Sequence, residues 1–117
     1  MFFIEIHCFF KIVALFLQNS LITGSERTLP LNAYKIEQVD DTELFTNPSY
    51  PIHVITGAAG NREGYATFIK DKPEWSVVRQ DDYSVSLIRA HPHEFSFYQI
   101  DKDAKMIDTF KIVKTKH

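Results

Sequence analysis

The sequence predicts a mainly β or α+β domain, with antiparallel strands and a C-terminal β-meander. The last third of the chain carries the strongest signal, because its apolar segments are rich in β-branched and aromatic residues and are separated by short polar links. These segments are 83–90, 94–100 and 105–113. An earlier apolar stretch, "IHVIT", is bounded by turn residues and predicts a further strand. At 117 residues the chain has room for one domain with a modest core.

The N-terminal residues 1–22, "MFFIEIHCFFKIVALFLQNSLI", are far more apolar than the rest of the chain. Residues 12–17 are similar to the hydrophobic region of a secretory signal, but Glu5 and His7 stand where a signal is basic. Three interpretations stay open: a targeting or anchoring segment, a buried apolar helix or strand, and an artefactual start. Because turn residues begin at Gly24, we divide the chain into an apolar segment, 1–24, and a domain, 25–117.

The middle of the chain is less regular. Residues 32–39, "NAYKIEQV", alternate in a way that predicts a half-buried strand. The following "DDTELFTNPSYP" is rich in Asp, Asn and Pro, which favour turns, so we expect a loop before the strand 52–56. Residues 65–76 are expected to form an irregular connection, in which Trp75 is most simply a packing anchor.

The meander allows a prediction of which side chains share a face, because successive residues of a strand point to opposite sides. Phe95 and Phe97 are expected on one face of the middle strand. Met106, Phe110 and Ile112 are expected on one face of the last strand. The sequence "DKDAK" is expected to form the turn between these two strands.

Composition excludes several classes of function. A net charge of −2 gives no electrostatic footprint for nucleic acid, and 44% hydrophobic residues exclude a disordered tail. The single cysteine, Cys8, can close no internal disulfide and gives no Cys-rich zinc site. We therefore expect no nucleic-acid partner, and the net charge of the chain does not identify any other kind of partner.

The glycine-rich "TGAAGNREG" follows the predicted strand 52–56 and is a candidate anion site. Backbone N–H groups at Gly57 and Gly60, together with the nearby Arg62, can form an anion-binding nest. The spacing matches neither GxGxxG nor GxxxxGK, and no lysine stands where a phosphate-loop lysine would. Glycine is also used where backbones pass close together, and this packing interpretation is favoured.

Two histidines in "HPH", His91 and His93, are the candidate metal ligands. Two residues apart on an extended segment, they would point the same way, but no third ligand stands at a diagnostic spacing. An exposed hairpin turn around Pro92 is the favoured interpretation. Adjacent acids at Asp81 and Asp82 are typical of solvated turns, and no nucleophile elbow accompanies any serine, so no catalytic residue is assigned. Glu26 and Arg27 are expected to pair with each other or to lie on the surface.

Four blocks, taken in order from residue 25 to 116, resemble the C-terminal region of the purple acid phosphatases, which are binuclear-metal phosphomonoesterases. "SERTLPLNAYKI" resembles the family's "SYERxWPxYxYKV", and "TNPSYPIHVITGAAGNREG" resembles its "P-V-H-I-x-x-G-x-A-G" segment. "EWSVVRQDDYSV" is similar to "W-S-x-x-R-x-x-D-Y-G-Y", and "FYQIDKDAKMIDTFKIVK" to the closing "xxEQVSDxxxGKVxDxxxxxK". The resemblance implies the C-terminal part of a metallophosphoesterase β-sandwich.

The sequence departs from the family at the metal ligands. A G-H-x-H ligand motif stands immediately before the first block in the family, whereas Leu21, Ile22 and Thr23 precede Gly24 here. The remaining ligands and the catalytic histidines come from earlier segments of the family, for which this chain has no room. The resemblance therefore implies no catalytic residue, metal ligand or cofactor in this chain, although full-length members hold binuclear iron with zinc, iron or manganese.

The expected function is that of a C-terminal domain or fragment of a purple acid phosphatase, an acid phosphomonoester hydrolase, without catalysis of its own. One alternative is a stand-alone β-rich binding or interaction module, and another is a phosphatase acting through "HPH" or by pairing with another chain. The expected partner is the missing catalytic region or another chain, and a membrane contact through residues 1–22 stays open. The family implies a secreted or endomembrane, lysosomal location. We expect exposed aromatic surface around Phe95, Phe97 and Phe110, where a catalytic region would pack.

Overall fold

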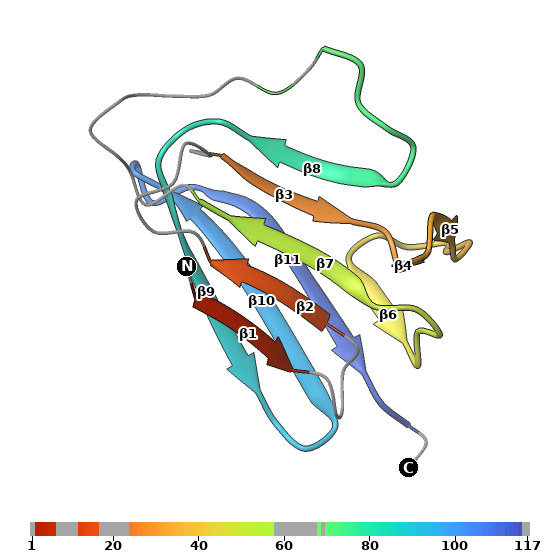
Figure 1. Cartoon of the computed structure of the whole chain (residues 1–117). Coiled ribbons are helices and arrows are strands. Elements are labelled where there is room, and N and C mark those ends of the chain that lie inside the picture. Colours follow the sequence, from red (N-terminus) through yellow and green to blue (C-terminus); the bar gives the residue numbers. More distant parts are fainter. Residues whose placement is uncertain (1, 7–11, 17–23, 58–67, 69, 116–117) are drawn as a thin grey trace.

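The computed structural model describes residues 2–6, 12–16, 24–57, 68 and 70–115, and all regular elements among them are strands. Two sheets pack face to face, with a small hairpin beside them (Figure 1). The five-stranded sheet has the order β1-β2-β7-β3-β8, with bounds Phe2–Ile6, Ile12–Phe16, Ile52–Thr56, Ser25–Thr28 and Ser76–Gln80. The four-stranded sheet has the order β6-β11-β10-β9, with bounds Leu44–Thr46, Met106–Val113, Glu94–Asp101 and Ser84–Ala90. The hairpin pairs β4 (Leu31–Asn32) with β5 (Lys35–Ile36).

The core lies between the two sheets and is built from their alternating inward side chains. From the five-stranded sheet come Ile52 and Val54 of β7, and from the four-stranded sheet come four residues of β10 and β11 and one of β6. These five are Phe45, Phe95, Phe97, Phe110 and Ile112. The Phe97 and Phe110 rings are 5.2 Å apart between centroids, and Phe45 meets Phe110 edge-on at 6.1 Å. The rings of the four-stranded sheet therefore pack on one another, and they face Ile52 and Val54 of the five-stranded sheet.

The predicted C-terminal meander is confirmed as β9, β10 and β11. β10 pairs antiparallel with both neighbours, so that Phe95 faces Ala90 on one side and Ile112 on the other. Phe95 and Phe97 do share the core face, as do Phe110 and Ile112. The aromatic surface that we expected to be exposed is instead closed, because Phe95, Phe97 and Phe110 are at most 2% exposed between the two sheets.

The prediction for Met106 is wrong. The register of β10 and β11 shifts between Gln99 and Ile100, so that Gln99 pairs with Asp108 while Ile100 pairs with Met106. The extra residue in β11, Ile107, reverses the inward and outward alternation, as a β-bulge does. Met106 consequently lies on the outer face of the four-stranded sheet, opposite to Phe110 and Ile112.

The N-terminal segment, for which a helix and a strand were both open, forms β1 and β2. These strands pair antiparallel with each other, and β2 pairs in parallel with β7 over Ile12–Phe16. The segment is therefore part of the five-stranded sheet, and the division of the chain at residue 24 stays a prediction. Within the described residues, no helix is long and apolar enough to cross a membrane.

The strand that we expected over 32–39 is a hairpin instead. Ala33 and Tyr34 both take positive φ, 48° and 63°, so the chain reverses between β4 and β5. Positive φ at both central residues is the geometry of a type I′ turn, which strand alternation alone does not reveal. The loop that follows contains one short strand, β6, which pairs in parallel with β11.

Candidate functional site

The glycine-rich segment begins where β7 ends, beside the start of β3 and the end of β8. The Gly57 amide donates to the Gly24 carbonyl at 2.9 Å, so this amide joins two strand ends. Such a contact is what the packing interpretation predicts for Gly57. Gly60 and Arg62 lie outside the described residues, and the anion-binding nest stays a prediction.

Gly24 occupies a place where no side chain fits. A Cβ atom there would lie 2.7 Å from Cε2 of Phe68 and 2.8 Å from the Gln80 carbonyl oxygen. Both are closer than van der Waals contact allows, and the carbonyl belongs to backbone that cannot swing away. Glycine is therefore required at position 24, because any side chain would clash with Phe68 and the Gln80 carbonyl. Leu21, Ile22 and Thr23, where the resembling family carries its ligand motif, lie outside the described residues.

The outer face of the five-stranded sheet carries a cross-strand ion pair. Glu26 of β3 accepts hydrogen bonds from Arg79 Nε and from the Ser76 hydroxyl, both at 2.7 Å. The Arg79 guanidinium also lies over the Phe68 ring, 5.0 Å from its centroid. Both charged side chains are only 11–13% exposed. Glu26 therefore links two adjacent strands, and its partner is not Arg27, contrary to our expectation.

Arg27 points the other way, into the interior. Its Nε and Nη2 donate to the two carboxylate oxygens of Asp108 at 2.7 and 2.8 Å, and Nη1 donates to the Thr42 carbonyl at 2.7 Å. The side chains of Arg27 and Asp108 are 3% and 7% exposed. The guanidinium also lies 4.8 Å from the centroid of the Phe110 ring. This bidentate pair joins β3 of one sheet to β11 of the other, 81 residues along the chain.

A second polar contact joins the two sheets near β9. The Ser86 hydroxyl is within hydrogen-bond distance of the Thr56 hydroxyl, 3.0 Å, and of Gln99 Oε1, 2.6 Å. Gln99 Nε2 donates to the Ser84 hydroxyl at 2.6 Å. Across the described part of the chain, no buried side-chain nitrogen or oxygen is left without a partner. A cavity of about 10 Å³ lies between this network and the Arg27–Asp108 pair, about the volume that one water needs.

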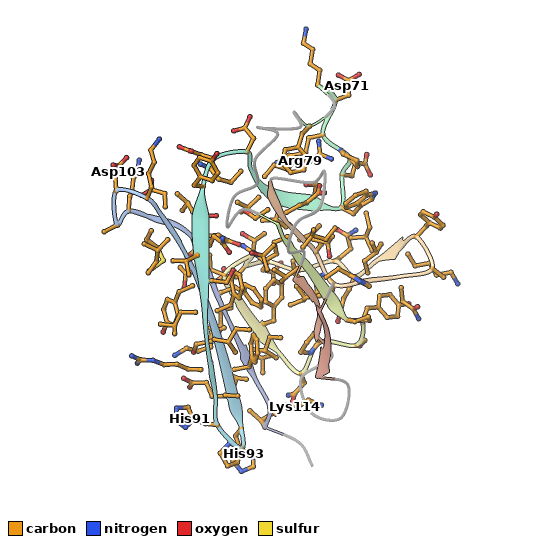
Figure 2. The ribbon with its side chains drawn as sticks, turned by 60° about the vertical axis from the view of Figure 1, so that its left-hand side comes forward. Asp71, Arg79, His91, His93, Asp103 and Lys114 are labelled. Atoms are coloured by element: carbon orange, nitrogen blue, oxygen red, sulfur yellow. The ribbon has the colours of Figure 1, made fainter. Side chains whose placement is uncertain are left out.

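The candidate metal histidines lie at the tip of the β9–β10 hairpin (Figure 2). The His91 amide donates to the Glu94 carbonyl at 2.8 Å, which closes the turn, and both histidines are exposed. The described ranges contain no group of three or more His, Cys, Asp and Glu side chains placed to hold a metal ion. His53 is elsewhere, with Nε2 3.1 Å from the Leu31 carbonyl. The donor set that two metal ions need is therefore not found among these residues.

The acidic residues after β8 and at the end of β10 form turns, as their sequences suggested. Asp82 accepts from the Tyr83 amide, and Asp101 accepts from the amides of Asp103 and Lys105. Lys102 reaches Asp82 at 3.3 Å. The hydrogen bond to Asp82, and the charge of that carboxylate, raise the pKa of the Lys102 ammonium above its usual value.

Sequence reasoning missed both polar links between the sheets. Nothing in the spacing of Arg27 and Asp108 pairs them, because their contact depends on how the two sheets stack. A detectable signal existed for Asp108, which lies on the same side of the predicted strand 105–113 as Phe110 and Ile112, where an unpaired charge would be too costly. No strand was predicted over Arg27, so no such signal pointed to its partner.

Fold and interior together define the class of protein: a two-sheet β-sandwich whose sheets are joined by buried polar contacts. A family model described as "Iron/zinc purple acid phosphatase-like protein C" matches residues 50–109, about half of the chain. The chain therefore belongs to the purple acid phosphatase family, in its C-terminal domain. The resemblance inferred from four sequence blocks is confirmed.

Curated relatives agree. Acid phosphatase type 7 of Danio rerio is 34% identical over 95 residues, which is 79% of this chain and 21% of that protein. Its counterpart in Mus musculus is 30% identical over 93 residues, 76% of this chain and 21% of the mouse protein. A nucleotide pyrophosphatase/phosphodiesterase of Hordeum vulgare is 31% identical over 90 residues, with coverage of 74% and 24%. The chain thus spans about a fifth of the length of the relatives it matches.

A solved structure shows the same fold. The purple acid phosphatase PPD1 from yellow lupin (Lupinus luteus) seeds superposes with a TM-score of 0.71 at 21% identity. The match covers 80% of this chain and 16% of the lupin chain. The two-sheet arrangement is therefore that of one part of a purple acid phosphatase.

Proposed function

We propose that this chain is a non-catalytic scaffold segment of a purple acid phosphatase, an acid phosphomonoester hydrolase. One observation supports this most directly: the charged groups Glu26, Arg27 and Asp108 are all used to hold strands and sheets together. In the full-length relatives the phosphatase chemistry would then come from the other four-fifths of the chain. Iron paired with zinc, iron or manganese would be held there by residues that this chain does not contain.

The proposal predicts that the purified chain hydrolyses no phosphomonoester. The test incubates it with iron and zinc salts, or with manganese, and follows an aryl phosphate at about pH 5, in the range where carboxylates and histidines of a phosphatase titrate. The zebrafish acid phosphatase type 7 serves as the positive control. Turnover that follows protein concentration and disappears with a chelator would contradict the proposal and favour an active enzyme.

The alternative of a stand-alone β-rich binding module has its own supporting observation. The apolar core is closed between the two sheets, with Phe95, Ile52 and Ile112 fully buried, so the chain has the interior of an independent domain. Unfolding of the isolated chain in urea tests the module. A molten, dye-binding chain would contradict it, whereas a single cooperative transition shows that the chain folds alone, which the module requires and which a scaffold segment with its own closed core allows.

We also propose that the protein enters the secretory or lysosomal route, on the basis of its apolar N-terminus and its family. In the structure, residues 12–16 form β2 and pair with β7. Removing residues 1–22 as a signal would open the β7 edge, so the exported protein is expected to keep them. Expression with a C-terminal tag, followed by fractionation and N-terminal sequencing, tests both statements; a cytosolic tag would contradict the first.

A further inference from the structure

The outer face of the four-stranded sheet carries a group of apolar side chains that no described residue covers. We call Val85, Leu87, Tyr98, Ile100 and Met106 the apolar face. Val85 is 62% exposed, Leu87 47% and Met106 46%. These side chains come from three adjacent strands, β9, β10 and β11.

The strand register brings these residues together. Ile100 pairs with Val85 on one side and with Met106 on the other, and Tyr98 pairs with Leu87 in the next outward row. Met106 joins this group only because of the bulge at Ile107. Contiguous exposed apolar side chains of this kind mark interaction surfaces more often than single ones do.

Charges of opposite sign flank the apolar face at its two ends. Beyond Ile100 and Val85 come the acidic turns, where four carboxylates accompany two lysines: Asp81, Asp82, Asp101, Asp103, Lys102 and Lys105. Beyond Leu87 and Tyr98 come three cations and one carboxylate: Arg89, Lys111, Lys114 and Glu94. Figure 2 shows the two ends well apart, with Asp103 at one and His91 and His93 at the other.

The two charged ends are symmetric about the middle of the apolar face. On β10, Ser96 lies between Arg89 and Lys111 and so gives the position of the basic row, while Lys102 gives the position of the acidic turn. Ser96 and Lys102 are each three residues from Gln99. At about 3.4 Å per residue, the two ends are roughly 20 Å apart. A two-fold axis can lie in the plane between two such faces, perpendicular to the strands and level with Gln99. Rotation about this axis gives the strands of the second copy the opposite direction to those of the first. Each basic row would then meet an acidic turn, and apolar side chains would meet apolar side chains.

We propose that the apolar face docks against the same face of a second copy of this chain, with the strands of the two copies antiparallel. The resulting contact is isologous and closes as a dimer, the commonest symmetry of protein assemblies. The complementary charges at the ends fix the antiparallel direction, because the parallel arrangement would place like charges together. This inference is independent of the proposed function, since it concerns assembly and not catalysis.

The size of the face sets the expected affinity. The three strands β9, β10 and β11, about 27 Å long and about 4.8 Å apart, offer roughly 400 Å² per copy. A contact of roughly 800 Å² in total is smaller than a standard-size interface and lies in the range of weak, transient complexes. We therefore expect a dissociation constant in the high micromolar range.

The experiment is sedimentation equilibrium of the full chain from about 1 to about 200 μM at moderate salt. The mass is expected to rise with concentration from 13.6 kDa towards twice that value. Leu87→Arg places a charge at the centre of the apolar face and is expected to weaken association at least about tenfold. Tyr34→Arg is the matched control, because Tyr34 is 93% exposed but lies on the β4–β5 hairpin, outside the face. Circular dichroism and the urea midpoint must show both variants folded.

Charge reversal tests the direction of docking. Lys111→Glu, and separately Asp103→Arg, are each expected to weaken the dimer about threefold or more, and the double variant is expected to recover most of that loss, because the axis places Lys111 of one copy over the β10–β11 turn of the other. A chain that stays monomeric at the highest concentration overturns the proposal and leaves the face to another occupant, such as the remaining part of a longer phosphatase. A dimer that is insensitive to Leu87→Arg also overturns it. Failure of the double variant to recover overturns the antiparallel arrangement.

Discussion

At the scale of single residues, the interior is held by a buried ion pair and not by apolar contacts alone. Arg27 gives three of its donors to Asp108 and the Thr42 carbonyl, and its guanidinium lies on the Phe110 ring. A buried pair contributes little compared with apolar residues of the same size, but the loss of one partner leaves a charge without compensation. Arg27 and Asp108 are therefore expected to tolerate joint replacement better than single replacement.

Asp108→Ala is expected to lower the free energy of unfolding by about 3–5 kcal/mol, because the Arg27 charge stays buried without its carboxylate. Urea denaturation measures the change. Asp81→Ala, at an exposed position, is the control and should stay within about 0.5 kcal/mol of the parent. The pair Arg27→Met with Asp108→Leu should lose less than Asp108→Ala alone. Equal effects of Asp108→Ala and the control would show that the ion pair does not hold the sheets.

Gly24→Ala is expected to destabilise the chain by about 1–3 kcal/mol, as overpacking does. The new methyl group would meet the Phe68 ring and the Gln80 carbonyl. Combining it with Phe68→Ala should recover only part of the loss, since the backbone carbonyl cannot withdraw. Thermal unfolding of the three variants measures this, and a Gly24→Ala chain as stable as the parent would disprove the close approach.

At the scale of elements, local pattern predicted strand type well and strand pairing poorly. The alternation in β10 and β11 was sufficient to place Phe95 with Phe97, and Phe110 with Ile112, on shared faces. It did not show that these faces are the core side, and the aromatic residues were expected to be exposed. The same rule failed for Met106, because a bulge adds one residue and no local signal marks Ile107 as the extra one. The hairpin at Ala33 and Tyr34 was also missed, because Ala and Tyr are not residues that readily adopt positive φ.

The β4–β5 turn is expected to be improved by residues that suit its geometry. Ala33→Asn with Tyr34→Gly places the preferred pair of a type I′ turn where both φ values are positive. We expect a gain of about 1–2 kcal/mol in the free energy of unfolding, because each left-handed residue other than Gly is strained. Tyr34→Ser keeps a side chain and controls for loss of the ring. A double variant with a lower urea midpoint than the parent would contradict this turn.

At the scale of the whole molecule, the sandwich depends on strands that are distant in sequence. β2 pairs with β7, and β6 pairs with β11, each across a gap of tens of residues. The order of strands in the two sheets could not be derived from propensity, because strand pairing is decided by the tertiary structure. The family resemblance, by contrast, was readable from four blocks in the correct order, and the family model confirms it. The same comparison of sequence blocks showed that Leu21, Ile22 and Thr23 stand where the family carries its histidine ligand motif.

Deletion of residues 1–23 tests whether β1 and β2 belong to the folded domain. The shortened chain, 24–117, would present the β7 edge that β2 covers, and an open strand edge promotes association. We expect a lower melting temperature and more light scattering than for the full chain. If the shortened chain is as stable and as soluble as the full one, the N-terminal strands contribute nothing to the sheet.

The central proposal is that this chain has the fold of a purple acid phosphatase C-terminal domain but lacks a set of side chains that holds two metal ions. Elemental analysis of the purified full chain, after incubation with iron, zinc and manganese and removal of the excess, tests it most directly. Because two metals need about six protein ligands, we expect well under one equivalent of metal per chain. Two tightly held equivalents, retained through gel filtration and released by a chelator, would contradict the account.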